Sequence, residues 1–98
     1  MTRQVRFHPA AELELHETAD FYDLESPGLG DDFLDDLERA LAQLIEFPES
    51  AAPALDNVRK HLLRRFPYTL LYSVQDEGIR VLAVAHLRRR PFYWRGRR

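Results

Sequence analysis

The chain has 98 residues, no cysteine and a formal net charge of −2 at pH 7. This length allows one domain, residues 1–98, with a modest core, and the lack of cysteine excludes disulfides and thiolate metal sites. No apolar run approaches the roughly 18 residues of a membrane helix, and the N-terminal MTRQVRFHP lacks a signal-peptide core, so a cytoplasmic location is expected.

The charge is divided unevenly between two halves of the chain. Residues 1–57 hold 3 arginines against 14 acidic residues, which gives −11. Residues 58–98 hold 10 arginines and 1 lysine against 2 acidic residues, which gives +9. This asymmetry predicts two electrostatically different faces, of which the basic one can meet a polyanion. Acidic helix surfaces are a simpler explanation of the first half.

The first half reads as a strand followed by two helices. QVRFH (4–8) alternates apolar and polar residues, and apolar residues at helical spacing predict a helix from about 9 to 25. SPGLG (26–30) is a turn, and a second amphipathic helix follows from 31 to 47, where Pro48 ends it. The short turn predicts an antiparallel helical hairpin.

The second half changes to a period of two. Residues 48–57 are predicted as a loop, and residues 58–66, 68–74 and 79–86 as strands, with QDEG (75–78) as a hairpin turn. The last strand is apolar on both faces, with Val81 and Ala83 on one and Leu82 and Val84 on the other, so it should lie inside the sheet.

The predicted order is therefore β-α-α-β-β-β. We expect an α+β fold in which the helical hairpin packs on one face of a small, twisted, mainly antiparallel sheet.

Basic residues of the predicted strands could form a groove. If 58–66 is one strand, Arg59, His61 and Arg65 share one face, and Lys60 and Arg64 share the other. The sheet face away from the helices could then collect Arg59, Arg65, Arg80 and the C-terminal arginines.

The segment HLRRRPFYW (86–94) combines a histidine, three arginines and three aromatic residues. Arginines beside aromatics suit single-stranded nucleic acid, and RNA cleavage needs a base, an acid and cations at the phosphate. His86 or Tyr93 could move protons. The plainer interpretations are that His86 is structural, that Trp94 packs against the domain, and that RGRR (95–98) is a frayed tail.

The sequence shows no signature of a metal or cofactor site. The four histidines, at positions 8, 16, 61 and 86, lack metal-ligand spacing, and no phosphate-binding loop or nucleophile motif is present. We therefore expect no metal and no cofactor.

The chain resembles the RelE/ParE superfamily, the toxins of bacterial type II toxin–antitoxin systems, often called plasmid stabilisation proteins. The segments that carry the resemblance, in order, are VRFHPAAELEL (5–15), Phe21–Tyr22, GLGDDFLDDLERAL (28–41), FPES (47–50), VRKHLLRRFPYTLLYSV (58–74) and IRVLAVAHLRRRPFYWRGR (79–97). The resemblance implies the RelE/ParE toxin fold and a cognate antitoxin that wraps a flexible segment around the toxin, in some members by adding a strand.

Family members divide into two activities, which the fold does not separate. ParE-like toxins block DNA gyrase, and RelE-like toxins cleave mRNA in the ribosome. A RelE-like activity would use Arg59, Arg65, His86 and Tyr93 as catalytic residues. PYTLLYSV (67–74) lacks the arginine that RelE-like nucleases often carry there, which favours the ParE-like activity.

Under either activity, seven residues are expected to bind the nucleic acid or protein target: Arg64, Arg80, Arg88, Arg89, Arg90, Trp94 and Arg95. A third hypothesis is a non-toxic module that only pairs with its antitoxin.

Overall fold

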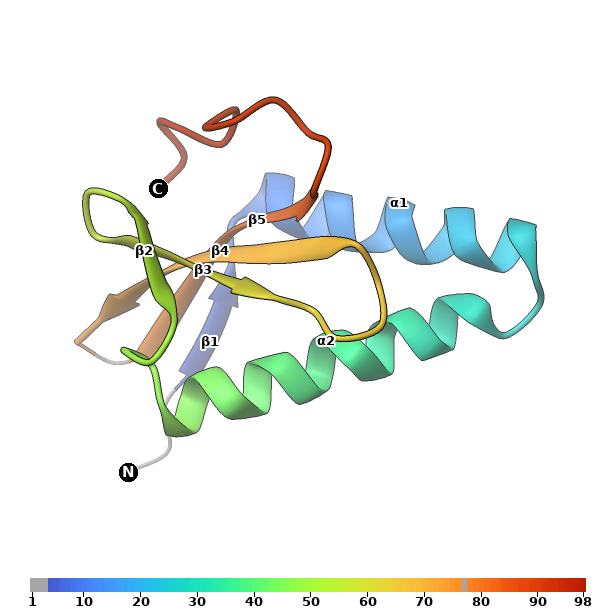
Figure 1. Cartoon of the computed structure of the whole chain (residues 1–98), viewed down its shortest axis with the longest axis horizontal. Coiled ribbons are helices and arrows are strands. Elements are labelled where there is room, and N and C mark those ends of the chain that lie inside the picture. Colours follow the sequence, from blue (N-terminus) through green and yellow to red (C-terminus); the bar gives the residue numbers. More distant parts are fainter. Residues whose placement is uncertain (1–3, 77) are drawn as a thin grey trace.

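The protein folds as two helices and a five-stranded sheet, which a computed structural model describes for residues 4–76 and 78–98 (Figure 1). The elements, in chain order, are β1 (Gln4–Phe7), α1 (Pro9–Glu25), α2 (Leu29–Glu46), β2 (Ala52–Leu55), β3 (Val58–Leu62), β4 (Tyr68–Gln75) and β5 (Gly78–His86). The predicted α+β class and helical hairpin are confirmed.

The sheet has the order β1-β5-β4-β3-β2. β1 runs parallel to β5, and the other neighbouring strands are antiparallel. β5 lies between β1 and β4, as its two apolar faces predicted. Gln75 pairs with Gly78 across the expected turn 75–78, in which Glu77 lies outside the described residues.

Both helices begin where local chemistry favours it. His8 Nδ1 accepts a hydrogen bond from the N–H of Ala10 at 3.0 Å, and Pro9 occupies the first turn of α1. Gly28, with φ of 88°, precedes α2, so this helix starts two residues earlier than predicted. A Cβ on Gly30 would lie 2.5 Å from the carbonyl oxygen of Ala19, so glycine lets the two helices approach closely there.

Two predicted boundaries are wrong. Residues 52–55, expected in a loop, form the edge strand β2 against β3, where a proline is tolerated at the sheet edge. The strand expected over 58–66 ends at Leu62, because the N–H of Leu63 donates to the carbonyl of Tyr68 and the chain turns. Arg64 and Arg65 therefore lie in a turn.

A bulge in β5 changes which of its side chains share a face. Leu71 pairs with Ala83 but Tyr72 pairs with Val81, so Leu82 is the extra residue. Val81 and Val84 consequently point into one core, and Leu82 and Ala83 into the other. The alternation predicted for this strand is interrupted for that reason.

The sheet separates two cores. On its helix face, Leu70, Tyr72 and Val81 pack with residues of α1 and α2 such as Ala11 and Phe33. On the opposite face, which we call the tail face, Leu71 and Leu82 pack with Trp94 of the C-terminal tail, residues 87–98. Figure 1 shows this tail and α2 on opposite sides of the strands.

Candidate functional site

The basic groove predicted on one sheet face does not form, because its residues lie on opposite faces. Arg59 pairs with Tyr72, which pairs with Val81, and both of these partners belong to the core on the helix face. Arg80 pairs with Ser73, which pairs with Val58 of the tail-face core. In-register neighbours point to the same side of a sheet, so Arg59 and Arg80 are separated by the sheet itself.

Arg59 is engaged with the backbone. Its Nη1 donates to the carbonyl oxygens of Glu49 at 3.0 Å and Ala51 at 2.8 Å, where the chain leaves α2 for β2. The hydroxyl of Tyr72 donates to the carbonyl of Pro48 at 2.7 Å nearby. These bonds tie the segment before β2 to the sheet.

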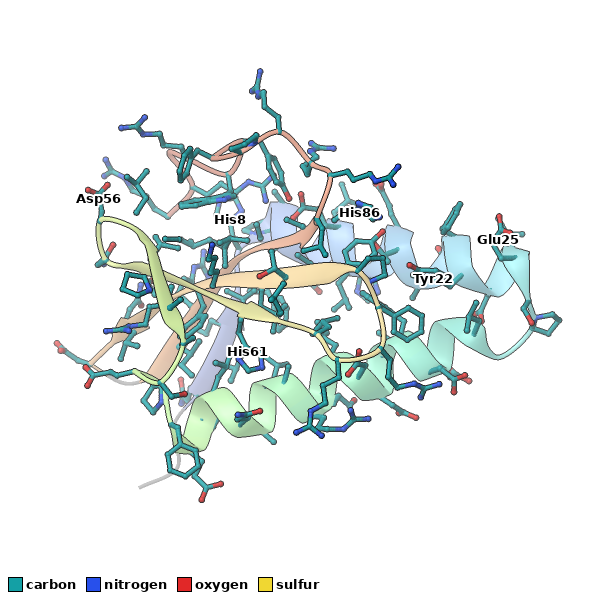
Figure 2. The ribbon with its side chains drawn as sticks, in the orientation of Figure 1. His8, Tyr22, Glu25, Asp56, His61 and His86 are labelled. Carbon is teal, nitrogen blue, oxygen red and sulfur yellow. The ribbon has the colours of Figure 1, made fainter. Side chains whose placement is uncertain are left out.

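Arg64 and Arg65 lie in the turn beside α2. The backbone N–H of Arg65 donates to Asp36 Oδ2 at 2.8 Å, and its guanidinium lies 3.9 Å from Asp32 Oδ2. Asp36 is 1% exposed and also accepts from Arg39. Burial, and then the charge of Arg64, lower the pKa of His61, which lies between the sheet and α2 (Figure 2).

The tail borders a cavity of about 330 Å³ on the tail face, which we call the tail groove. Its lining comes from β2, β3, β4, the end of β5 and the tail, and consists of Pro53, Ala54, Lys60, Leu62, Thr69, Leu71, Ala85, His86, Leu87, Arg89, Arg90, Pro91, Phe92, Tyr93 and Trp94.

The tail groove is apolar in its walls and basic in its charged groups. Leu62 is 59% exposed and Phe92 is 47% exposed, although both are large apolar side chains. Lys60, Arg89 and Arg90 supply positive charge, and no acidic residue is among the lining residues that the structure describes. Such a surface suits a partner that brings apolar side chains and carboxylates.

Thr69 adds a polar feature to the groove. Its Oγ1 is buried and has no hydrogen-bond partner among the described residues. A buried hydroxyl without a partner has a free-energy cost, which a bound group could offset.

The tail is anchored by three residues. Trp94 is 6% exposed and lies in the tail-face core. It was expected to bind the target, but it packs against the domain, as the plainer interpretation held. Arg97 donates from Nη1 to Glu14 Oε1 at 2.9 Å and to the carbonyl of Leu82 at 3.0 Å. The hydroxyl of Tyr93 donates to Glu14 Oε2 at 2.7 Å. The tail is therefore docked rather than frayed.

Glu14 is a site residue that the sequence reasoning missed. It follows Ala11 by three positions and precedes Thr18 by four, so it belongs to the buried stripe of α1. An acidic residue within such a stripe is the signal that could have revealed it, because buried carboxylates are paired.

His86 and Tyr93 come together, with Arg89, around a hollow of about 260 Å³ between α1 and the end of β5. His86 Nδ1 accepts from the N–H of Arg88 at 3.0 Å, and its ring meets that of Tyr68 edge-on at 5.1 Å. Figure 2 shows His86 where the chain leaves β5. Arg59 and Arg65 do not line this hollow.

Burial raises the pKa of the Tyr93 hydroxyl, and its hydrogen bond to the Glu14 carboxylate raises this pKa further. The guanidinium of Arg89 lies 4.2 Å from the centre of the Tyr93 ring. Tyr93 therefore holds its proton firmly and is packed between charged neighbours.

The other arginines predicted to bind the target differ in whether their guanidinium groups already have partners. Arg80 donates to the carbonyls of Phe7 and Arg98, which occupies its guanidinium. Arg88 and Arg95 are exposed, and like Arg89 and Arg90 they form no ion pair within residues 4–76 and 78–98.

Neither described helix is long and apolar enough to cross a membrane. Nowhere in the described part of the chain do three histidine or acidic side chains gather as a metal site would require.

Residues 5–91 match the model of a family described as the ParE toxin of the type II toxin–antitoxin system parDE. The chain is 33% identical over 90 residues to Toxin ParE2 of two Mycobacterium tuberculosis strains, which covers 88% of this chain and 83% of each relative.

Two solved structures share the fold. A chain of the chromosomal ParDE system from P. aeruginosa superposes with a TM-score of 0.74 at 18% identity, covering 87% of this chain and 96% of that one. A chain of the RelBE2 toxin–antitoxin complex from M. tuberculosis superposes with a TM-score of 0.59 at 24% identity, covering 88% and 99%.

Proposed function

Since this chain belongs to the ParE toxin family and is the toxin of a type II toxin–antitoxin system, we propose that it inhibits growth by binding DNA gyrase in the cytoplasm. In this proposal the protein acts by binding and performs no chemistry. The exposed tail arginines and the tail groove contact the target. A cognate antitoxin is its partner.

One observation carries the proposal: the residues that a nuclease would need are dispersed. Arg59 lies on the helix face and is bonded to two carbonyl oxygens, and Arg65 lies in the turn beside α2. His86 and Tyr93 line the hollow beside α1, and neither Arg59 nor Arg65 is among the residues that line it. A phosphate bound in that hollow would have neither expected arginine in the wall around it, and electrostatic stabilisation needs cations preorganised at the reacting group.

The surface chemistry of the tail face supports a binding role. The tail groove offers apolar walls with a basic rim, and Arg88 and Arg95 extend the positive charge outside it. Charge complementarity of this kind accelerates association with an acidic partner and makes it depend on salt. The same features suit an acidic segment of the antitoxin, which would neutralise the toxin by covering this surface.

A decisive test compares two assays on the purified toxin. We expect inhibition of supercoiling by gyrase, reversed by adding the antitoxin, with ribosome-bound mRNA left intact. Arg6, an exposed residue of the edge strand β1, offers a control, because Arg6→Gln should inhibit as well as the wild type. Supercoiling that proceeds normally at saturating toxin would contradict the proposal.

The alternative function is a ribosome-dependent mRNA endonuclease, and one observation favours it. His86, Arg89 and Tyr93 share a hollow, which places a titratable base near a cation. In that case His86→Ala should abolish mRNA cleavage while the fold persists. If this variant still cleaves mRNA, His86 is not the base, and the endonuclease hypothesis loses the observation that favours it. A chain that arrests neither process, yet binds the antitoxin, would match the non-toxic module.

A further inference from the structure

The carboxylate of Glu14 joins three parts of the molecule. Its Oε2 accepts from the hydroxyl of Tyr93 at 2.7 Å and from Arg97 Nη2 at 3.3 Å. Its Oε1 accepts from Arg97 Nη1 at 2.9 Å and from the backbone N–H of Val84 at 3.0 Å. The side chains of Glu14 and Arg97 are only 21% and 18% exposed. A helix, a strand and the tail thus meet at one partly buried charge pair.

The sheet explains why a carboxylate is needed there. β1 pairs with β5 only over Gly78–Val81, and the N–H of His8 then donates to the carbonyl of Val81. Past this point the edge of β5 still presents the N–H of Val84 and the carbonyl of Leu82. Glu14 accepts from the first, and Arg97 donates to the second. The charge pair therefore takes the place of a neighbouring strand.

The tail depends on this anchor because it has no helix or strand of its own. Its backbone bonds are short turns, such as those from the N–H of Tyr93 to the carbonyl of Arg90 and from the N–H of Arg95 to that of Phe92. Arg89 lies over the Tyr93 ring, 4.2 Å from its centre. A chain of contacts consequently runs from Glu14 through Tyr93 to Arg89 at the rim of the tail groove.

We propose that Glu14 is the positioning residue for target binding: through Tyr93 and Arg97 it holds the tail so that the groove and its arginines are formed before the partner arrives. The inference rests on the proposed function in taking the tail face as the target-binding surface. A tail that must first be ordered would bind more weakly, because the conformational entropy lost on ordering it reduces the free energy of binding. Glu14 itself need not touch the target.

The test uses Glu14→Gln, which keeps the shape and removes the charge, and the matched control Glu25→Gln on the same helix, whose side chain is exposed. Hydrogen exchange should accelerate about tenfold or more at the amides of Arg95 and Arg97 in Glu14→Gln, with α2 unchanged. The concentration needed to inhibit gyrase should rise about tenfold, which is about 1.4 kcal/mol. Tail amides that exchange at the wild-type rate, or inhibition equal to that of Glu25→Gln, would overturn the proposal.

A double-mutant cycle separates positioning from a general loss of stability. If Glu14 acts through Tyr93, then Tyr93→Phe should lose much of the same inhibition, and adding it to Glu14→Gln should cost little more. Fully additive losses would contradict the coupling. Both variants should remain folded at the assay temperature, which thermal denaturation checks.

The role of Glu14 can be tested even if gyrase is not the target. Growth inhibition in cells that lack the antitoxin does not require the target to be known. If the wild type stops growth but does not inhibit gyrase, the proposed target is wrong, and the comparison of Glu14→Gln with Glu25→Gln still decides the role of Glu14. A wild-type chain that leaves growth unaffected would overturn both.

Discussion

Two groups of arginines look alike in the sequence and differ in the structure. Arg59, Arg64 and Arg65 lie on the helix side, where Arg59 bonds to carbonyls and Arg65 lies beside Asp32 and Asp36. Arg88, Arg89, Arg90 and Arg95 lie on the tail, exposed and without an ion pair among the described residues. In the first group the guanidinium of Arg59 and the backbone N–H of Arg65 are engaged with the fold, whereas the arginines of the second group are exposed to a partner.

The difference shows that the charge of a segment does not measure its capacity to bind. A guanidinium that already donates to two carbonyls must break those bonds before it can bind a phosphate or a carboxylate. An exposed arginine has to give up only hydrogen bonds to water when it binds a partner. Two single substitutions, one triple substitution and one pH series test this contrast, and the substitutions come in decreasing order of their expected effect on the free energy of unfolding.

Trp94→Ala should have the largest effect. Its indole closes the tail-face core at 6% exposure, so truncation leaves a cavity and exposes Leu71 and Leu82. We expect a loss of about 3 kcal/mol or more in the free energy of unfolding, measured by urea denaturation. Phe92→Ala is the matched control, because that ring is 47% exposed and should lose far less. Equal losses would show that the tail is not docked by Trp94.

Asp36→Ala should lower the free energy of unfolding, because Asp36 holds the turn that contains Arg65. Asp36 accepts from the N–H of Arg65 and from Arg39, so its removal leaves a partly buried N–H without a partner. We expect a loss of about 2 kcal/mol in the same measurement. Asp35→Ala, an exposed neighbour, should change stability by less than about 0.5 kcal/mol. A small effect of Asp36→Ala would contradict the view that the bond from Arg65 to Asp36 stabilises the fold.

Replacing Arg88, Arg89 and Arg90 by glutamine should barely change stability, by about 0.5 kcal/mol at most, since all three are exposed. Target binding should nevertheless weaken about tenfold or more, and its dependence on salt should become shallower. Inhibition assays at two salt concentrations measure both effects. Unchanged inhibition would mean that the tail arginines do not face the target.

Alkaline pH should weaken the tail anchor. The pKa of Tyr93 is raised by burial and by Glu14, so the folded state retains this proton more strongly than the unfolded chain. The stability from this group is therefore complete below the unfolded pKa of about 10 and is lost as pH rises through the folded pKa. Denaturation between pH 9 and 11 should show a decline, and Tyr93→Phe should make it shallower, with the rest due to Tyr22 and Tyr72, whose pKa values burial also raises. An equal slope in both proteins would contradict this origin.

Elements whose signals are local could be predicted from the amino-acid sequence. Apolar stripes at helical spacing, bounded by Pro9, Gly28 and Pro48, marked both helices within two residues. The change to a period of two marked the three long strands, and the order of motifs indicated the family that the comparisons then confirmed. Hydrophobic periodicity and turn residues act over a few positions, so they can be read without the fold.

The tertiary structure alone decided which side chains meet. The short edge strand β2 exists because β3 offers it partners, and the bulge at Leu82 reversed part of the face assignment in β5. Glu14 lies 79 residues from Tyr93 and 83 from Arg97, and no periodic pattern reports contacts over such separations. Which arginines are engaged and which are free depends on packing of distant segments, and it was settled only when the chain folded.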